Sequence, residues 1–299
     1  MRASALIPAA VLVASCGQPA PILDADRCLA HVERQVKIGE RPSGSPGIEK
    51  AREWILSELK ASGLEPVVDR FAAETHRGPM AMANVRVEIA GDSPGVVALV
   101  SHYDSKLLPG VTFVGANDPG SSVAVVLEVA RHFATHRPPI GLRIVFVDGE
   151  ETQASKSWDD SDSLYGSRHE AKRLATSGEV ARTKVVIVLD MIGDRDLNVL
   201  RESRASDRLV GWFREAAEET GCASKFFATA QAMTDDHVPF LEAGVADVID
   251  LIDFSYGPPG NTYWHTAQDT LDKISKESLR LVGDVVIRAI PKIAHGLTR

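Results

Sequence analysis

Leu142-Arg-Ile-Val-Phe-Val147 followed by Asp148-Gly-Glu-Glu151 is the stretch of sequence that decides the fold. The apolar run 142–147 has the length of a buried strand. It ends abruptly in acidic residues, as a strand does when its carboxyl end faces a ligand. Two neighbouring glutamates at such an end can divide the chemistry: one carboxylate holds a divalent metal and the other moves protons. A Glu-Glu pair alone is usually just solvated, so this interpretation depends on the rest of the chain.

Composition sets the class of protein. The chain has 299 residues, of which 44% are hydrophobic and 25% charged, enough for one sizeable core. We therefore expect a single α/β domain. The net charge is −8 and no basic cluster is present, which argues against nucleic acid as a partner.

The first 16 residues differ from the remainder. Arg2 precedes the apolar stretch 5–13, and small residues lead to Cys16, the pattern of a secretory signal too short to span a bilayer. Residues 13–16 also resemble the lipobox of bacterial lipoproteins, in which Cys16 would be lipidated; an ordinary signal with an incidental cysteine is the alternative. We expect an exported protein of the bacterial cell envelope, held at the membrane only by a lipid anchor, with a tether at 17–29 and the folded domain at 30–299.

Further elements follow from apolar patterns. Apolar runs predict buried strands at 96–100, 184–189 and 248–252, and alternation predicts a half-buried strand at 85–89. Helices are expected after the N-cap Ser45 and Pro46, at 123–133, at 206–220 and at 279–290.

Several predicted strands end in residues that bind metals or move protons. In open α/β sheets ligands gather at the carboxyl ends of the strands, so these residues are expected to share one site. Taken singly, Asp118 is more simply a helix cap, Asp190 a turn acid and His265 a surface residue. Jointly, five residues supply the nitrogen and oxygen ligands that zinc accepts and leave Glu150 as a free base: His102, Asp118, Glu151, Asp190 and His265.

Five motifs in this order resemble the M28 zinc-peptidase superfamily. They are His102-x-Asp104, Gly115-Ala-Asn-Asp118, Asp148-Gly-Glu-Glu151, Leu189-Asp-Met-Ile-Gly193 and Trp264-His-Thr266. The resemblance covers the chain from about residue 30. It implies a single α/β domain with a twisted, mixed, largely parallel central sheet flanked by helices.

Within that superfamily the chain is more similar to glutaminyl cyclases than to general aminopeptidases. The stretches 102–106, 162–169 and 235–240 and the residue Trp158 carry this resemblance. No chemistry can be assigned to the side chains of 162–169, and a structural interpretation is that Tyr165 and Arg168 support the Glu150-Glu151 loop.

The cyclase resemblance implies a set of roles. Asp118, Glu151 and His265 would bind one catalytic zinc, whose fourth position stays open for the substrate. The substrate would be the N-terminal glutamine of a peptide or protein, which closes to pyroglutamate and releases ammonia. Glu150 would carry the proton from the attacking amine to the leaving ammonia.

Other residues would complete the pocket. By the same resemblance, Asp190 and Asp235 would hydrogen-bond around Glu150, and Trp158 and Trp264 would wall a small pocket. For Trp158 an exposed position in a loop is the alternative. We expect a monomer.

The chain also departs from animal cyclases, which carry a cysteine where Ser101 stands and form a nearby disulfide with it. The only cysteines after Cys16 are Cys28 and Cys222, and sequence cannot tell whether they pair. The stretch 253–263 is longer and richer in Gly and Pro than in the animal enzymes.

Two other functions compete. In a zinc aminopeptidase, Asp118 would bridge two metals, His102 and Asp190 would complete one site, and Glu151 and His265 the other; Glu150 would then deprotonate water. An inactive binding protein on the same scaffold predicts damage to at least one essential position, and none is damaged.

Overall fold

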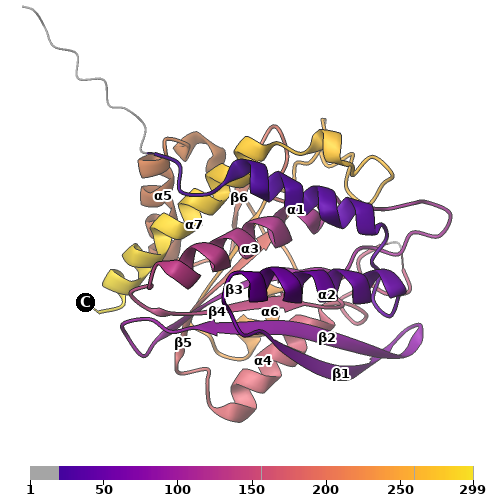
Figure 1. The fold of residues 1–299 in the computed structure, drawn as a ribbon, viewed down its shortest axis with the longest axis horizontal. Coiled ribbons are helices and arrows are strands. Elements are labelled where there is room, and N and C mark those ends of the chain that lie inside the picture. The colour runs from indigo at the N-terminus through magenta and orange to yellow at the C-terminus, as the bar shows by residue number, and fades with distance from the viewer. Residues whose placement is uncertain (1–19, 156, 259, 299) are drawn as a thin grey trace, which may run out of the picture.

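A six-stranded sheet forms the centre of the computed structural model, which describes residues 20–155, 157–258 and 260–298 (Figure 1). The strand order is β1-β2-β4-β3-β5-β8, in which β4, β3, β5 and β8 are parallel and β1 and β2 join antiparallel. These strands are β1 (Val67–Thr75), β2 (Gly78–Ile89), β3 (Val96–His102), β4 (Gly141–Val147), β5 (Thr183–Asp190) and β8 (Asp247–Ile252). The predicted mixed, largely parallel sheet is confirmed. A separate parallel pair comprises β6 (Val199–Glu202) and β7 (Phe226–Gln231).

Helices cover both faces of the sheet (Figure 1). One face packs against α1 (Ala25–Ile38), α2 (Pro46–Ala61), α3 (Gly120–Thr135), α5 (Asp207–Thr220) and α7 (Lys276–Gly296). The other packs against α4 (Tyr165–Ser177) and α6 (His237–Glu242). Two short 3₁₀ turns lie at Ala223–Lys225 and Leu271–Lys273. The central strands β3, β4 and β5 are buried on both faces, which explains why their sequences are continuous apolar runs.

Local signals set the boundaries of α2 as predicted. The Ser45 hydroxyl accepts a hydrogen bond from the Ile48 backbone N–H at 3.3 Å, and Pro46 occupies the first turn. After the helix, Gly63 has φ +79°, a left-handed conformation that glycine adopts without a Cβ clash.

The expected tether at 17–29 is wrong in its second half, because α1 begins at Ala25. Leu23 and Cys28 are buried, and the backbone N–H groups of Ile22 and Leu23 donate to Asp284 on α7 at 3.1 and 2.8 Å. Those contacts bind the start of α1 to the C-terminal helix, so the folded domain begins near residue 22. The signal and the lipobox with Cys16 lie outside the described residues.

Cys28 and Cys222 are both buried and free. Among the helices that the structure describes, none is both long and apolar enough to cross a membrane.

Candidate active site

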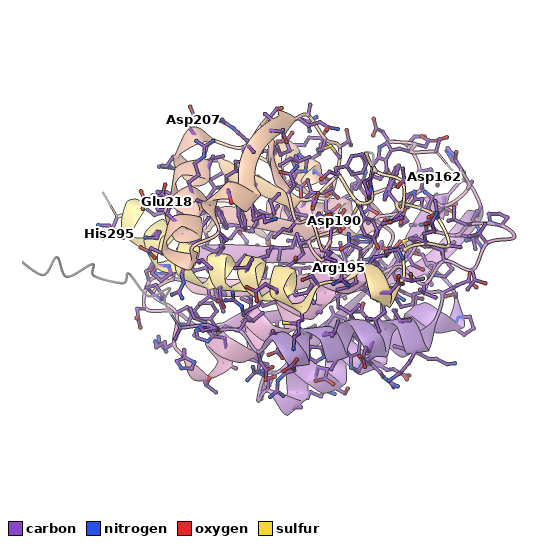
Figure 2. All side chains as sticks on the ribbon, turned by 90° about the horizontal axis from the view of Figure 1, so that it is seen from above. Asp162, Asp190, Arg195, Asp207, Glu218 and His295 are labelled. Carbon is purple, nitrogen blue, oxygen red and sulfur yellow. The ribbon has the colours of Figure 1, made fainter. Side chains whose placement is uncertain are left out.

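The carboxyl ends of β3, β4 and β5 converge as predicted. His102 is the last residue of β3 and pairs in register with Val147, the last residue of β4. Asp148 to Glu151 follow β4, and Asp190 ends β5 on the far side of β3. Because these strands are parallel neighbours, their end residues meet at one edge of the sheet. Asp190 is buried and lies near the middle of the view in Figure 2, whereas Asp207 and Glu218 on α5 lie toward its periphery.

Asp118, Glu151 and His265 form one group suited to a metal ion. His265 Nε2 lies 3.2 Å from Asp118 Oδ2 and 3.1 Å from Glu151 Oε1, and one ligand atom from each residue falls within 4.8 Å of the others. Burial lowers the pKa of His265, but Glu151 and Asp118 outweigh it and raise the pKa to about 10. A proton on His265 thus balances one of the two negative charges, in the place where a divalent cation could balance both.

A second group shares Asp118. His102 Nε2 lies 3.2 Å from Asp118 Oδ1 and 3.2 Å from Asp190 Oδ1, and these three residues could also hold a metal. Asp118 therefore faces both groups, and it does not cap α3, whose N-cap is Pro119 with no side-chain capping bond. All five ligand candidates are brought together, so the structure is compatible with one metal or with two.

Glu150 belongs to neither group, although it adjoins both. Its carboxylate Oε2 lies 3.8 Å from His102 Nδ1, and the side chain faces the same cavity. Burial raises the pKa of Glu150 well above its usual range, against the opposing effect of His102, and Glu151 and Asp235 add to the rise. A buried carboxyl that readily holds a proton is suited to acid–base chemistry.

Asp104 fixes the two glutamates. The backbone N–H groups of Glu150 and Glu151 donate to its two carboxylate oxygens at 3.1 and 3.3 Å. In the His102-x-Asp104 motif, His102 is therefore a candidate metal ligand and Asp104 holds the backbone of the two glutamates. The sequence pattern alone does not reveal the second role.

The segment 162–169 supports the loop that carries the glutamates. The Leu164 and Tyr165 backbone N–H groups donate to the carbonyl oxygens of Glu150 and Gly149 at 3.0 and 2.8 Å. The Asp162 carboxylate accepts from Ala154 N–H at 2.9 Å. The segment therefore supports the loop directly through its backbone and Asp162. Tyr165 and Arg168 contribute only indirectly, because the Tyr165 hydroxyl donates to Asp162 Oδ1 at 2.8 Å and the Arg168 guanidinium donates to the Asp160 carbonyl oxygen at 2.7 Å.

Asp190 and Asp235 are placed differently from the expectation that they hydrogen-bond around Glu150. Asp190 bonds to His102, Asp235 Oδ1 accepts from the Asp236 backbone N–H, and within the described chain neither bonds to Glu150. His102 contacts both Asp190 and Glu150, so it separates their like charges. Burial raises the pKa of Asp190 to about 7 and raises that of Asp235.

A cavity of about 260 Å³ opens onto these groups. The acids Glu150, Asp190 and Asp235 face it, and its apolar walls come from Trp158, Met233, Ile252, Phe254 and Trp264. Trp264 stacks on His265 at 4.0 Å and meets Phe254 edge-on. Trp158 is half-buried and lines the cavity rather than lying wholly at the loop surface.

Sequence reasoning missed a buried polar cluster behind the cavity. Asp235, His237 and Asp250 form a third group that could hold a metal, with Asp236 beside them. Burial raises the pKa of Asp236 and Asp250 well above the usual range and lowers that of His237 to about 3, so burial favours the uncharged form of each side chain. The available signal was Asp250, an acid in the middle of an apolar strand.

A helix-flanked, largely parallel sheet with acid and histidine groups at its carboxyl edge defines a peptidase-like α/β scaffold whose residue groups could hold a metal. The model of peptidase family M28 matches residues 84–290, and the chain belongs to that family.

The chain is also similar to individual proteins of known structure or sequence. A glutaminyl cyclase structure from an Acidobacteriales bacterium is 36% identical, with a TM-score of 0.87 over 98% of this chain and 100% of that one. The bovine glutaminyl-peptide cyclotransferase-like protein is 30% identical over 262 residues, which cover 77% of this chain and 66% of that protein. A Zn-dependent exopeptidase structure from Parabacteroides distasonis is 27% identical, with a TM-score of 0.80 over 90% and 98% of the two chains.

Proposed function

We propose that this chain is a zinc-dependent glutaminyl-peptide cyclotransferase, which converts N-terminal glutamine of peptides or proteins to pyroglutamate and releases ammonia. The observation that carries the proposal is the 36% identity with a bacterial glutaminyl cyclase across 98% of the chain. The geometry supports it, because Glu150 and residues of two groups that could hold a metal face one small cavity.

Asp118, Glu151 and His265 are proposed to hold the zinc. Two carboxylate oxygens and one imidazole nitrogen are ligands that catalytic zinc accepts, and three protein ligands leave a position for the substrate. When bound, zinc would supply Lewis acidity that polarises the γ-carbonyl of the substrate glutamine.

Glu150 is proposed to move the proton. It accepts a proton from the substrate α-amine as the bond from that nitrogen to Cδ forms. It then donates the proton to the side-chain amide nitrogen as the bond from that nitrogen to Cδ breaks, so ammonia leaves. The raised pKa of Glu150 suits a group that alternates between base and acid.

The cavity walls are proposed to select the substrate. Asp190 and Asp235 face the cavity with Glu150 and offer carboxyl oxygens that can accept hydrogen bonds from the substrate α-amine. Trp158 and Trp264 contribute aromatic surface that contacts the aliphatic part of a glutamine side chain.

Mass spectrometry of two peptides tests the proposal. The chain without residues 1–16 is incubated with one peptide that begins with Gln and one that begins with Leu. We expect the Gln peptide to lose the mass of one ammonia molecule and the Leu peptide to keep its mass. Release of free Leu instead would identify an aminopeptidase.

The aminopeptidase remains the second candidate because His102, Asp118 and Asp190 form a complete further metal group. In that enzyme Asp118 would lie between two metals, and Glu150 would take a proton from water. Similarity to the Zn-dependent exopeptidase is compatible with it.

Export and lipidation are proposed from residues 1–16 alone. The test is to express the full chain in a bacterium and compare it with Cys16→Ser. A lipoprotein moves from the membrane fraction to the soluble fraction when Cys16 is replaced, and an unchanged distribution rejects the anchor.

A further inference from the structure

Lys106 is a buried cation beside the proposed zinc site. It follows β3 in the chain, and its side chain is 0% exposed. Its ammonium donates to the Thr152 carbonyl oxygen at 3.1 Å and lies 3.3 Å from Glu151 Oε2. A buried ammonium is costly unless it is paired, so this contact is a specific feature of the fold.

The two oxygens of Glu151 face different partners. Oε1 lies 3.1 Å from His265 Nε2, within the group that includes Asp118. Oε2 is buried and, in the described part of the chain, makes no hydrogen bond of good geometry, so Lys106 is its charged neighbour. Only one oxygen of Glu151 is thereby directed toward the metal-binding group.

We infer that Lys106 is a positioning residue that holds Glu151 in a one-oxygen arrangement and keeps the bound metal electron-poor. This inference rests on the proposed function, because it assigns Glu151 to a catalytic metal. A cation on the outer oxygen draws charge from the carboxylate, so Glu151 becomes a weaker donor. A bound metal would then be held less tightly but would polarise a carbonyl oxygen more strongly.

The charge balance of the site supports the same conclusion. Asp118 and Glu151 carry two negative charges, which would cancel those of a divalent cation. Lys106 adds one positive charge in a buried setting, where charges act strongly. The buried ammonium would thereby help to stabilise the negative charge that develops on a carbonyl oxygen during attack.

The contact with Thr152 could also make Lys106 a purely structural residue, and the variants must separate the two roles. Lys106→Met keeps the aliphatic stem and removes both the charge and the hydrogen bond. Lys106→Gln removes the charge and keeps a donor for the Thr152 carbonyl, so it covers the case in which the Met variant does not fold. Arg143→Met is the matched control: it removes a buried cation near the opposite end of β4.

The experiment measures zinc affinity by competition with a chelator, the visible spectrum of the cobalt-substituted protein, and kcat and KM on a Gln peptide. For both Lys106 variants we expect zinc affinity equal to or tighter than that of wild type, with kcat lower by about 10–100-fold. The cobalt spectrum should shift toward a higher coordination number as Glu151 gains use of its second oxygen. Arg143→Met should lower the melting temperature and leave zinc affinity and the spectrum unchanged.

Either of two results overturns the inference. Weaker zinc binding together with lower kcat would make Lys106 merely structural, and an unchanged cobalt spectrum with unchanged kcat would remove any role in the site. If wild type forms no pyroglutamate, the proposed function fails, whereas zinc affinity and the cobalt spectrum still decide the role of Lys106.

Discussion

The two ends of strand β4 differ in how their buried charges are balanced by charges of opposite sign. Near its start, Arg143 is 1% exposed and its guanidinium donates to Glu88 at 2.5 Å and also to Glu179. After its end, Asp148, Glu150 and Glu151 are all buried among other acids. At the first end Glu88 and Glu179 are paired with three arginines, Arg143, Arg173 and Arg182. At the second end the acids outnumber the cations.

This difference separates a stabilising contact from a reactive one. Buried acids without enough counter-charge raise one another's pKa and destabilise the folded protein when no metal is bound. Proteins keep such unfavourable clusters mainly at functional sites. The paired end has no such excess, and no ligand is needed to balance it. We therefore expect substitutions after β4 to act on turnover and metal binding, and substitutions near its start to act on stability.

Glu150→Gln should give the largest effect. Without the carboxylate no group in the same position can carry the proton, so kcat should fall by about 10²–10⁴-fold. Bound zinc, counted by plasma mass spectrometry, should stay at the wild-type level. A variant that loses its zinc would show that the two glutamates have been assigned in the wrong order.

Glu151→Gln should show the reverse pattern. A neutral amide replaces an anionic ligand, so zinc affinity should fall by more than about 100-fold, since even partners outside the ligand set are worth about 10–100-fold. Activity should return in part when zinc is added in excess. Chelator competition measures the affinity, and wild-type affinity would contradict the ligand assignment.

Arg143→Met should affect stability alone. It breaks a buried ion pair, but Glu88 and Glu179 are partly exposed and can be hydrated, so we expect a loss of about 1–3 kcal/mol in the free energy of unfolding. Urea denaturation of the zinc-loaded protein measures it. A lower kcat in the folded variant would contradict the expectation that substitutions near the start of β4 act on stability alone.

Asp148 should make the metal-free protein less stable as pH rises. Burial, with Asp104 adding to it, raises the pKa of Asp148 to about 7 from an ordinary value of about 3.9. Between these values the folded chain holds a proton that the unfolded chain has lost, so this contribution to stability falls from about pH 4 to pH 7 and then levels off. In Asp148→Asn, the slope of the free energy of unfolding against pH should become flatter by the equivalent of about one proton across that range, as measured by urea unfolding. An unaltered slope would contradict the raised pKa of Asp148.

Trp158→Ala should give the smallest effect. The ring lines the cavity but is half-buried, so KM for a Gln peptide should rise by about 2–10-fold, in line with an aromatic contact of about 0.5–1.5 kcal/mol. Trp212→Ala, a half-buried tryptophan on α5, is the control and should leave KM unchanged. Equal KM values for both variants would remove Trp158 from the substrate pocket.

Sequence patterns predicted the central strands and α2 because their apolar runs and capping residues act locally. They do not predict the start of α1, because two of its four buried residues, His31 and Gln35, are polar and weaken the apolar periodicity. The metal-binding groups could be predicted because strand ends meet by topology. The contact of Lys106 with Glu151 could not, because it joins residues 45 positions apart through side-chain conformations that no local pattern encodes.

Titration of the metal-free protein with zinc distinguishes a one-metal cyclase from a two-metal aminopeptidase, with ammonia release from a Gln peptide as the readout. We predict that activity rises linearly and reaches its plateau at about one zinc per chain, the number that a site of three protein ligands with one open position requires. Activity that rises until about two zinc ions are bound, with free Leu released from a Leu peptide, would contradict it and identify the two-metal enzyme.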